Sequence, residues 1–253
     1  KHLRQQGRTA GISEALVENW LAQGNYEEVI AHIEQTRGPR VFAQEIRDKF
    51  GKQGVIRGIT LRISELFTDT LITTNYDRLL EQVFETGGTS RVEVVNGVTS
   101  MALPDATKIT IIKIHGDVRD PAHCILSRGQ YDAAYGETDL DLQRPVPKIL
   151  SRYYRNNSLL FLGCSLRNDR TLHVFKASLE AAGDVDIPRH FAIVQLPDSI
   201  EDVQARNSEL VNLGIIPIWY PSDQHDLVEE ILRHARNELS YRKVMKARSS
   251  SQN

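Results

Sequence analysis

The chain has 253 residues and a formal net charge of −2, from 31 Lys and Arg against 33 Asp and Glu. This balance excludes nucleic-acid binding driven by a large positive charge, and no apolar run approaches the roughly 20 residues that a membrane-spanning helix requires. The two cysteines, Cys124 and Cys164, are too few for a disulfide framework or a four-cysteine zinc ribbon. We therefore expect a cytoplasmic protein with no membrane segment, no bound metal and no direct contact with nucleic acid.

Residues 1–67 carry helical patterns and no strand signal, and we predict a small helical subdomain there. Ser13 is expected to cap the first helix, and Asn25 with Glu28 has the spacing of a capping box for the second. The Gly38-Pro39 pair combines a residue that ends helices with one that begins them, so a third helix is expected to follow it.

From Thr70 onward, short runs rich in apolar and β-branched residues alternate with helical patterns. Five runs are expected to form strands: Thr70–Thr74, Lys108–Ile114, Ser158–Leu162, Phe191–Gln195 and Gly214–Tyr220. The helices expected between and after them cover Asp77–Glu85, Leu140–Tyr154, Asp169–Ala181, Ile200–Leu213 and Gln224–Leu239. Strands that are apolar on both faces and separated by helices indicate a parallel sheet covered by helices. We therefore predict a doubly wound α/β domain over residues 68–240.

Three smaller segments complete the prediction. Two short runs, near Arg91–Val95 and His123–Leu126, are expected to form a hairpin at the edge of the sheet. Residues 241–253 combine several basic side chains with a polar end, and we expect them to form a frayed tail.

Polar side chains follow three of the predicted strands. Thr74-Asn75-Tyr76-Asp77 comes after the first strand, His115-Gly116-Asp117 after the second and Gly163-Cys164-Ser165 after the third. Ligands of parallel α/β sheets bind outside the carboxyl ends of the strands. We therefore predict that these three blocks converge on one binding crevice.

Each block also has a purely structural interpretation. Asn75 or Asp77 would serve as the N-cap of the following helix, and His115 would be a turn residue with a satisfied imidazole. Gly163 and Ser165 would be loop and cap residues, and both cysteines would be small, buried, apolar side chains. From the residues alone, these alternatives remain open.

Taken together, the three blocks resemble the sirtuin-like family, and more closely the Sir2-like domains of bacterial antiphage defence proteins. The matching segments are Ile72–Glu81 (ITTNYDRLLE), Lys113–Asp117 (KIHGD) and Phe161–Ser165 (FLGCS), which occur in the order of the family. The resemblance covers residues 55 to 240 and implies a Rossmann-like, sirtuin-type fold that binds NAD.

The resemblance also implies roles for individual residues. Asn75 would lie near the nicotinamide ribose and orient the attacking group, and His115 would act as a general base toward a ribose hydroxyl. Gly163 and Ser165 would contact NAD. The remaining members of the implied NAD-binding set are Thr74, Tyr76, Asp77 and Cys164.

Two features of the family pattern are missing from the sequence. The family begins with a strand and a Gly-Ala-Gly-x-Ser loop whose backbone amides hold the pyrophosphate, and no such segment occurs here. Either this loop lies upstream of Lys1 or the chain binds NAD poorly, and the first residue, Lys1 and not Met, favours the upstream position. The protein-deacylating members carry a zinc ribbon of four cysteines, which two cysteines cannot build.

The resemblance therefore favours an NAD+ hydrolase that releases nicotinamide and ADP-ribose and depletes NAD+ in antiphage defence. Such an enzyme is expected to be controlled by oligomerisation or by a partner protein such as an ATPase or a nuclease. One alternative is a catalytically silent module that binds NAD or ADP-ribose and regulates a partner. A second, less favoured alternative is an NAD-dependent protein deacylase.

Overall fold

The computed structural model describes residues 11–52, 54–88, 91–100, 105, 107–137, 139–164, 166, 170–183 and 185–250. The chain folds into two compact units, each built from separate stretches of sequence. The first unit comprises Lys1–Gly54, Thr70–Glu81 and Val92–Ser151, and the second comprises Val55–Asp69, Gln82–Arg91 and Arg152–Asn253. The first two blocks of the predicted site thus belong to the first unit, and the third block belongs to the second unit.

Helices form the beginning of the first unit, as the sequence predicts: α2 (Glu14–Ala22), α3 (Tyr26–Arg37) and α4 (Pro39–Phe50). The Ser13 side chain accepts a hydrogen bond from the backbone of Leu16 and caps α2. The predicted capping box at Asn25 is wrong, because the Asn25 amide donates to Gln23 instead of capping α3. The apolar faces of the three helices share one core, formed by Val17, Val29, Ile33, Phe42, Ile46, Val118 and Cys124.

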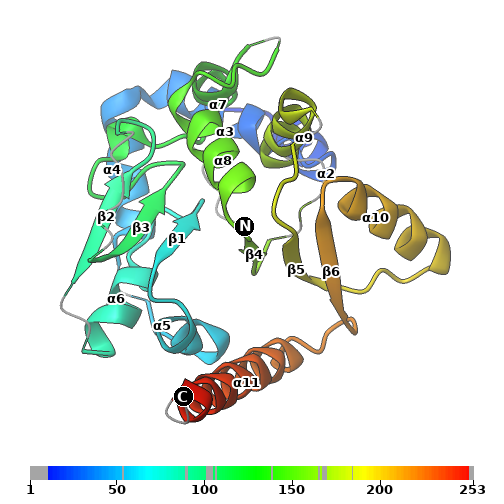
Figure 1. Ribbon diagram of the computed structural model, residues 1–253. Coiled ribbons are helices and arrows are strands. Elements are labelled where there is room, and N and C mark those ends of the chain that lie inside the picture. The colour runs from blue at the N-terminus through cyan, green and yellow to red at the C-terminus, as the bar shows by residue number, and fades with distance from the viewer. Residues whose placement is uncertain are drawn as a thin grey trace. The chain divides into compact units, whose positions relative to one another are not determined.

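A three-stranded sheet forms the centre of the first unit, with the order β1 (Thr70–Thr73), β3 (Ile109–Lys113) and β2 (Val92–Asn96) (Figure 1). Both pairings are parallel, and every residue of the central strand β3 is buried. The parallel sheet predicted from runs that are apolar on both faces is thereby confirmed for this unit.

The predicted hairpin at the sheet edge is wrong. The first of its two segments is β2, which pairs in parallel with β3, and the second contains a short 3-10 helix, η2 (Pro121–His123), and no strand. Local hydrogen bonds explain this outcome, because the Ile125 backbone N–H donates to His115 and its carbonyl accepts from the Tyr76 hydroxyl. Neither backbone group of Ile125 is therefore left for a strand partner.

Helix α7 (Arg128–Tyr135) belongs to the first unit, whereas α6 (Leu79–Thr86) and α8 (Pro145–Asn156) begin in the first unit and end in the second. Helix α7 begins with a capping box in which Ser127 and Gln130 bond to each other's backbone. This box fixes the start of α7, and α7 carries two tyrosines into the candidate site.

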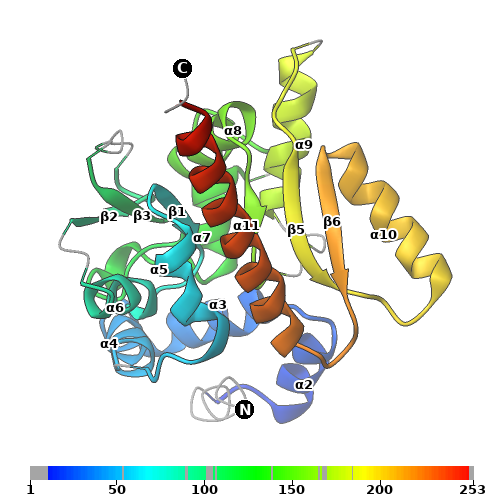
Figure 2. The same ribbon diagram turned by 60° about the horizontal axis from the view of Figure 1, so that its bottom comes forward.

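The second unit contains its own parallel sheet, with the order β4 (Leu160–Phe161), β5 (His190–Gln195) and β6 (Ile215–Tyr220). Its helices are η1 (Gly58–Arg62), α5 (Ile63–Leu66), α9 (Arg170–Ala182), α10 (Ile200–Asn212) and α11 (Asp226–Ser250). Helix α10 lies beside β6 (Figure 2). Val228 and Leu232 of α11 are buried with Ile193 of β5, so the first part of α11 belongs to the core.

The long helix α11 differs from the prediction, since it continues through Ser250 where a frayed tail is expected from residue 241 (Figure 2). The segment from Asp226 to Ser250 contains no Gly or Pro and is rich in Leu, Glu, Lys and Arg, which favour helix. In the part of the chain that the structure describes, no helix combines the length and the apolar character needed to cross a membrane.

Candidate SIR2-like site

The first two blocks of the predicted site follow neighbouring strands. Strands β1 and β3 pair in register with Thr73 opposite Lys113, and the Ile114 N–H donates to the Thr73 carbonyl at 3.0 Å. Because parallel strands end at the same edge of their sheet, the loops that carry Asn75 and His115 leave adjacent strands at the same edge. The structure thus brings these two blocks together in the first unit.

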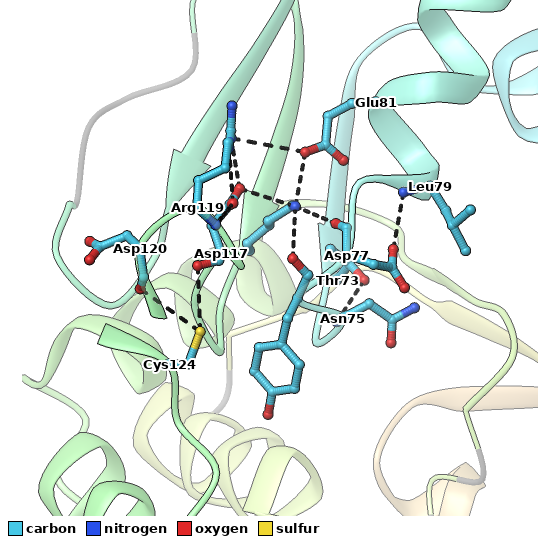
Figure 3. A network of polar contacts seen from close by, with 11 residues as sticks. Thr73, Asn75, Asp77, Leu79, Glu81, Asp117, Arg119, Asp120 and Cys124 are labelled. Atoms are coloured by element: carbon cyan, nitrogen blue, oxygen red, sulfur yellow. Dashed lines mark hydrogen bonds and ion pairs between the residues drawn. The ribbon is translucent and has the colours of Figure 1, made fainter. Parts of the chain in front are cut away.

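The loop after β1 exposes the Asn75 side chain. Its backbone N–H donates to the Thr73 hydroxyl at 3.1 Å, whereas its side-chain amide has no partner among the described residues (Figure 3). The Asp77 carboxylate accepts from the Leu79 backbone at 3.0 Å and so supports the start of α6. Asp77 and not Asn75 therefore bonds to the first turn of α6, and the structural interpretation of Asn75 as a cap is wrong. Thr74 is exposed beside Asn75.

Tyr76 points in the opposite sense, into the core of the first unit. Its hydroxyl donates to the Ile125 carbonyl at 2.6 Å, and its ring lies 5.4 Å from that of Phe50. Burial raises the pKa of Tyr76 above its ordinary value, so the hydroxyl stays protonated. The side chain of Tyr76 thus ties the loop after β1 to the segment after β3.

His115 is buried, with 8% of its surface exposed, and both ring nitrogens face tyrosines of α7. Its Nε2 lies 2.8 Å from the Tyr135 hydroxyl, and its Nδ1 lies 3.5 Å from the Tyr131 hydroxyl. The imidazole contacts both tyrosine rings edge-on. These tyrosines were not predicted from the sequence, because α7 was not among the predicted helices.

Burial lowers the pKa of His115 from 6.5 to about 4. Burial has this effect because charging the ring would place a cation in a poorly hydrated site. At pH 7 the ring is neutral. It can still accept a proton, but as a weaker base than an exposed histidine.

This shift predicts a loss of stability in acid. Between pH 6.5 and pH 4 the unfolded chain protonates His115 and the folded chain does not, so the stabilisation is complete above pH 6.5 and declines toward pH 4. We expect His115→Gln to reduce the difference in unfolding free energy between pH 7 and pH 4.5 by about 2–3 kcal/mol. Chemical denaturation at both pH values measures this difference in unfolding free energy. Substitution of the exposed His173 by Gln is the control. An unchanged difference would contradict the burial of His115.

A cluster of charged side chains, buried except for Arg119, lies beside the two loops and was not predicted (Figure 3). The Lys113 ammonium pairs with Glu81 at 2.9 Å and with Asp117 at 3.1 Å. Arg119 binds the Asp117 carboxylate through two nitrogens, at 2.9 and 2.7 Å. Burial opposes ionisation of Asp117, but the hydrogen bonds and charges of Arg119 and Lys113 outweigh it and lower its pKa to about 2.

The third block begins in the second unit after β4. Gly163 has a φ of +66°, a conformation that favours glycine, and open space where a Cβ would lie. Cys164 is exposed, so its interpretation as a buried apolar side chain is wrong, whereas Cys124 is buried as expected. Ser165 lies outside the described residues, and the convergence of this block with the other two stays a prediction.

Two further observations concern other possible sites. No group of three or more His, Cys, Asp or Glu side chains arranged to hold a metal occurs among the described residues. A pocket of about 240 Å3 lies against Cys124 and is lined largely by apolar side chains such as Val98, Ile125, Ala133 and Val146. It is separate from the exposed Asn75 amide.

Comparison with known proteins agrees with the motifs and the fold. The model of the SIR2-like domain family matches residues 69–218, which is more than half of the chain. The chain is also 25% identical over 216 residues to the NAD(+) hydrolase ThsA of Bacillus cereus (strain MSX-D12). That match covers 79% of this chain and 43% of ThsA, so the chain spans less than half the length of this relative. The parallel α/β fold, the ordered motifs and the family match lead to one conclusion: the chain belongs to the family of SIR2-like domains.

Proposed function

We propose that the chain is the catalytic domain of an NAD+ hydrolase, which cleaves the bond between nicotinamide and ribose and releases nicotinamide and ADP-ribose. The observation that carries the proposal is the pairing of an exposed, unpartnered amide at Asn75 with a neutral imidazole at His115, at the ends of adjacent parallel strands. The similarity to an NAD(+) hydrolase supports the same substrate.

NAD+ cleavage requires a group that orients the nucleophile and a group that accepts a proton, and Asn75 and His115 can supply them. Loss of nicotinamide leaves positive charge on the ribose, as in glycoside cleavage, and the protein must orient a nucleophile without trapping that charge. The Asn75 amide is neutral, so it can orient water or a ribose hydroxyl through hydrogen bonds alone. Water then forms the new bond to the ribose carbon, nicotinamide departs with the electrons of the broken bond, and the released proton passes to His115 or to solvent.

In this scheme Tyr135 orients the His115 ring. Its hydroxyl lies at hydrogen-bonding distance from Nε2, which directs the other ring nitrogen, Nδ1, toward the more distant Tyr131 hydroxyl. A ribose hydroxyl that took the place of the Tyr131 hydroxyl could bond to Nδ1 of His115. The tyrosines thereby select which nitrogen serves the substrate.

The direct test is product analysis with NAD+. We expect the full chain to release nicotinamide and ADP-ribose in equal amounts, as measured by chromatography. Asn75→Ala should lower the rate by about 100-fold, because an unoriented nucleophile loses its advantage of position. Thr86→Ala is the control, because Thr86 is exposed on α6 and its hydroxyl donates to the Gln82 carbonyl of the same helix. Equal turnover by the wild type and Asn75→Ala would refute the assignment of Asn75.

The biological role that we propose is NAD+ depletion in antiphage defence, in a cytoplasmic assembly of several copies or with a partner such as an ATPase or a nuclease. The resemblance of the three sequence blocks to defence proteins supports it. Expression in bacteria challenged with phage, followed by measurement of cellular NAD+, tests this role. NAD+ should fall after infection in cells with the wild type and remain constant with Asn75→Ala.

A silent NAD- or ADP-ribose-binding module is the second candidate. The observation that favours it is the burial of His115 against Tyr131 and Tyr135, which weakens it as a base. This candidate predicts calorimetric binding of ADP-ribose with no nicotinamide release at any enzyme concentration. Nicotinamide release that depends on Asn75 would exclude it.

A further inference from the structure

Lys113 is a buried cation with no part in the proposed chemistry. It is the last residue of the central strand β3, and 0% of its surface is exposed. An ammonium group in such a place loses its hydration and is retained only where charged and polar partners compensate it. The partners of Lys113 therefore indicate what the residue does.

Four partners with oxygen atoms surround the Lys113 ammonium, two through ion pairs and two through hydrogen bonds, and they come from three segments. Two are carboxylates, Glu81 of α6 at 2.9 Å and Asp117 of the loop after β3 at 3.1 Å. The other two are backbone carbonyls of the loop after β1, those of Tyr76, at 3.4 Å, and Asp77. The Lys113 side chain thus contacts both loops that carry the proposed catalytic groups.

Hydrogen bonds hold the backbone of the loop after β1 on both sides of the exposed Asn75. Tyr76 and Asp77 directly follow Asn75, and the Tyr76 carbonyl also accepts from the Val118 N–H at 2.9 Å. On the other side, the Asn75 N–H is held by the Thr73 hydroxyl. The backbone is therefore fixed on both sides of Asn75, while its side-chain amide stays free to meet a ligand.

The charges of the cluster balance. Lys113 and Arg119 oppose Glu81 and Asp117, and Arg119 also approaches Glu81 at 3.9 Å. Both carboxylates are buried, with 3% and 4% of their surfaces exposed. Removal of the Lys113 charge would consequently leave Glu81 without its nearest counter-charge and Asp117 with Arg119 alone.

We propose that Lys113 is a positioning residue that sets the distance between Asn75 and His115 by holding the loops after β1 and β3 against each other. The inference rests on the proposed NAD+ cleavage for its kinetic consequences, whereas its structural consequences stand apart from it. Lys113 is the first residue of the matched segment KIHGD, and its neighbours in β3 are apolar or Thr.

The kinetic test uses the full chain and four variants. Lys113→Met should lower kcat for nicotinamide release by about 100-fold and change KM by less than about 3-fold, because misplaced catalytic groups affect the transition state more than binding. Lys108→Met removes a half-exposed lysine just before β3 and should match the wild type. Glu81→Gln keeps the carbonyl contacts of Lys113 and should retain most of the activity.

The double variant Lys113→Met/Glu81→Gln separates positioning from folding. It removes the uncompensated carboxylate, so its melting temperature should recover toward that of the wild type while kcat stays low. Recovery of both melting temperature and kcat would show that Lys113 serves only the fold, and would overturn the inference. A low kcat in Glu81→Gln equal to that of Lys113→Met would overturn it as well, by assigning the effect to the ion pair.

Amide exchange tests the same inference without turnover. In the double variant the backbone N–H groups of Asn75 and Val118 should exchange at least about 10-fold faster than in the wild type, with unchanged exchange in the helices α2 to α4. Unchanged exchange at Asn75 and Val118 would contradict the positioning role. A wild type that cleaves no NAD+ but shows this exchange difference would refute the proposed function and leave the positioning role supported.

Discussion

Substitution of His115 by Gln is expected to lower kcat for NAD+ cleavage by about 10²–10⁴-fold, the range of a lost general base. The reason is chemical, because an amide cannot accept the proton that leaves the attacking group. The pKa of about 4 also fixes the pH dependence. The active form is the neutral imidazole, so kcat/KM should fall only below about pH 5 and not near pH 6.5. A rate measurement from pH 4.5 to 8 examines both points.

Tyr135→Phe is the matched control for His115. It keeps the ring that contacts the imidazole and removes the hydroxyl 2.8 Å from Nε2. We expect a smaller loss of about 10-fold, because the base remains and only its orientation is relaxed. If His115→Gln retained wild-type kcat, the imidazole would be a structural group, and the silent-module candidate would gain its strongest support.

Substitution of Tyr154 by Ala is expected to destabilise the second unit by about 3–5 kcal/mol, the usual cost of truncating a buried aromatic side chain. The ring is fully buried and stacked between Phe175 and His190, with ring centroids 4.6 and 4.4 Å apart. Its hydroxyl donates to the Leu213 carbonyl at 2.6 Å. Loss of the ring leaves a cavity, and loss of the hydroxyl leaves a buried carbonyl without its donor.

Tyr154→Phe separates these two contributions. It keeps the stacked ring and should cost about 1–3 kcal/mol, the penalty for an unsatisfied buried carbonyl. Urea denaturation of both variants gives the comparison. Equal destabilisation by Phe and Ala would show that the hydrogen bond to Leu213 and not the stacking accounts for the stability, contrary to our expectation.

The strands of the sheets could be predicted from the sequence because parallel strands are buried on both faces. The runs at residues 108–114 and 214–220 consist mostly of apolar residues, and both contain a strand. The partner of β2 could not be predicted, since its residues suit a parallel or an antiparallel neighbour equally well.

The candidate site was predictable at the strand ends and not around them. The position of Asn75 and His115 follows from the rule that parallel strands present their ends at one edge. The tyrosines around His115 come from α7, a short helix whose polar residues give a weak pattern. The burial and the lowered pKa of His115 depend on that helix, so neither could be derived from the motif.

One available signal was overlooked. Lys113 stands inside an apolar run that was predicted to be buried on both faces. A lysine in such a strand requires acidic or carbonyl partners, and Asp117 and Glu81 both belong to the neighbouring motifs. The charged cluster could therefore have been proposed from the sequence, although its contacts with the Tyr76 and Asp77 carbonyls could not.

The most direct test of the account is an experimental structure of the protein with ADP-ribose bound. We expect the distal ribose at the edge of the sheet where β1 and β3 end. One of its hydroxyls should lie about 3 Å from a ring nitrogen of His115, and another should lie within hydrogen-bonding distance of the Asn75 amide. A nucleotide bound elsewhere, such as in the pocket beside Cys124, with Asn75 facing solvent and His115 still enclosed by Tyr131 and Tyr135, would contradict it.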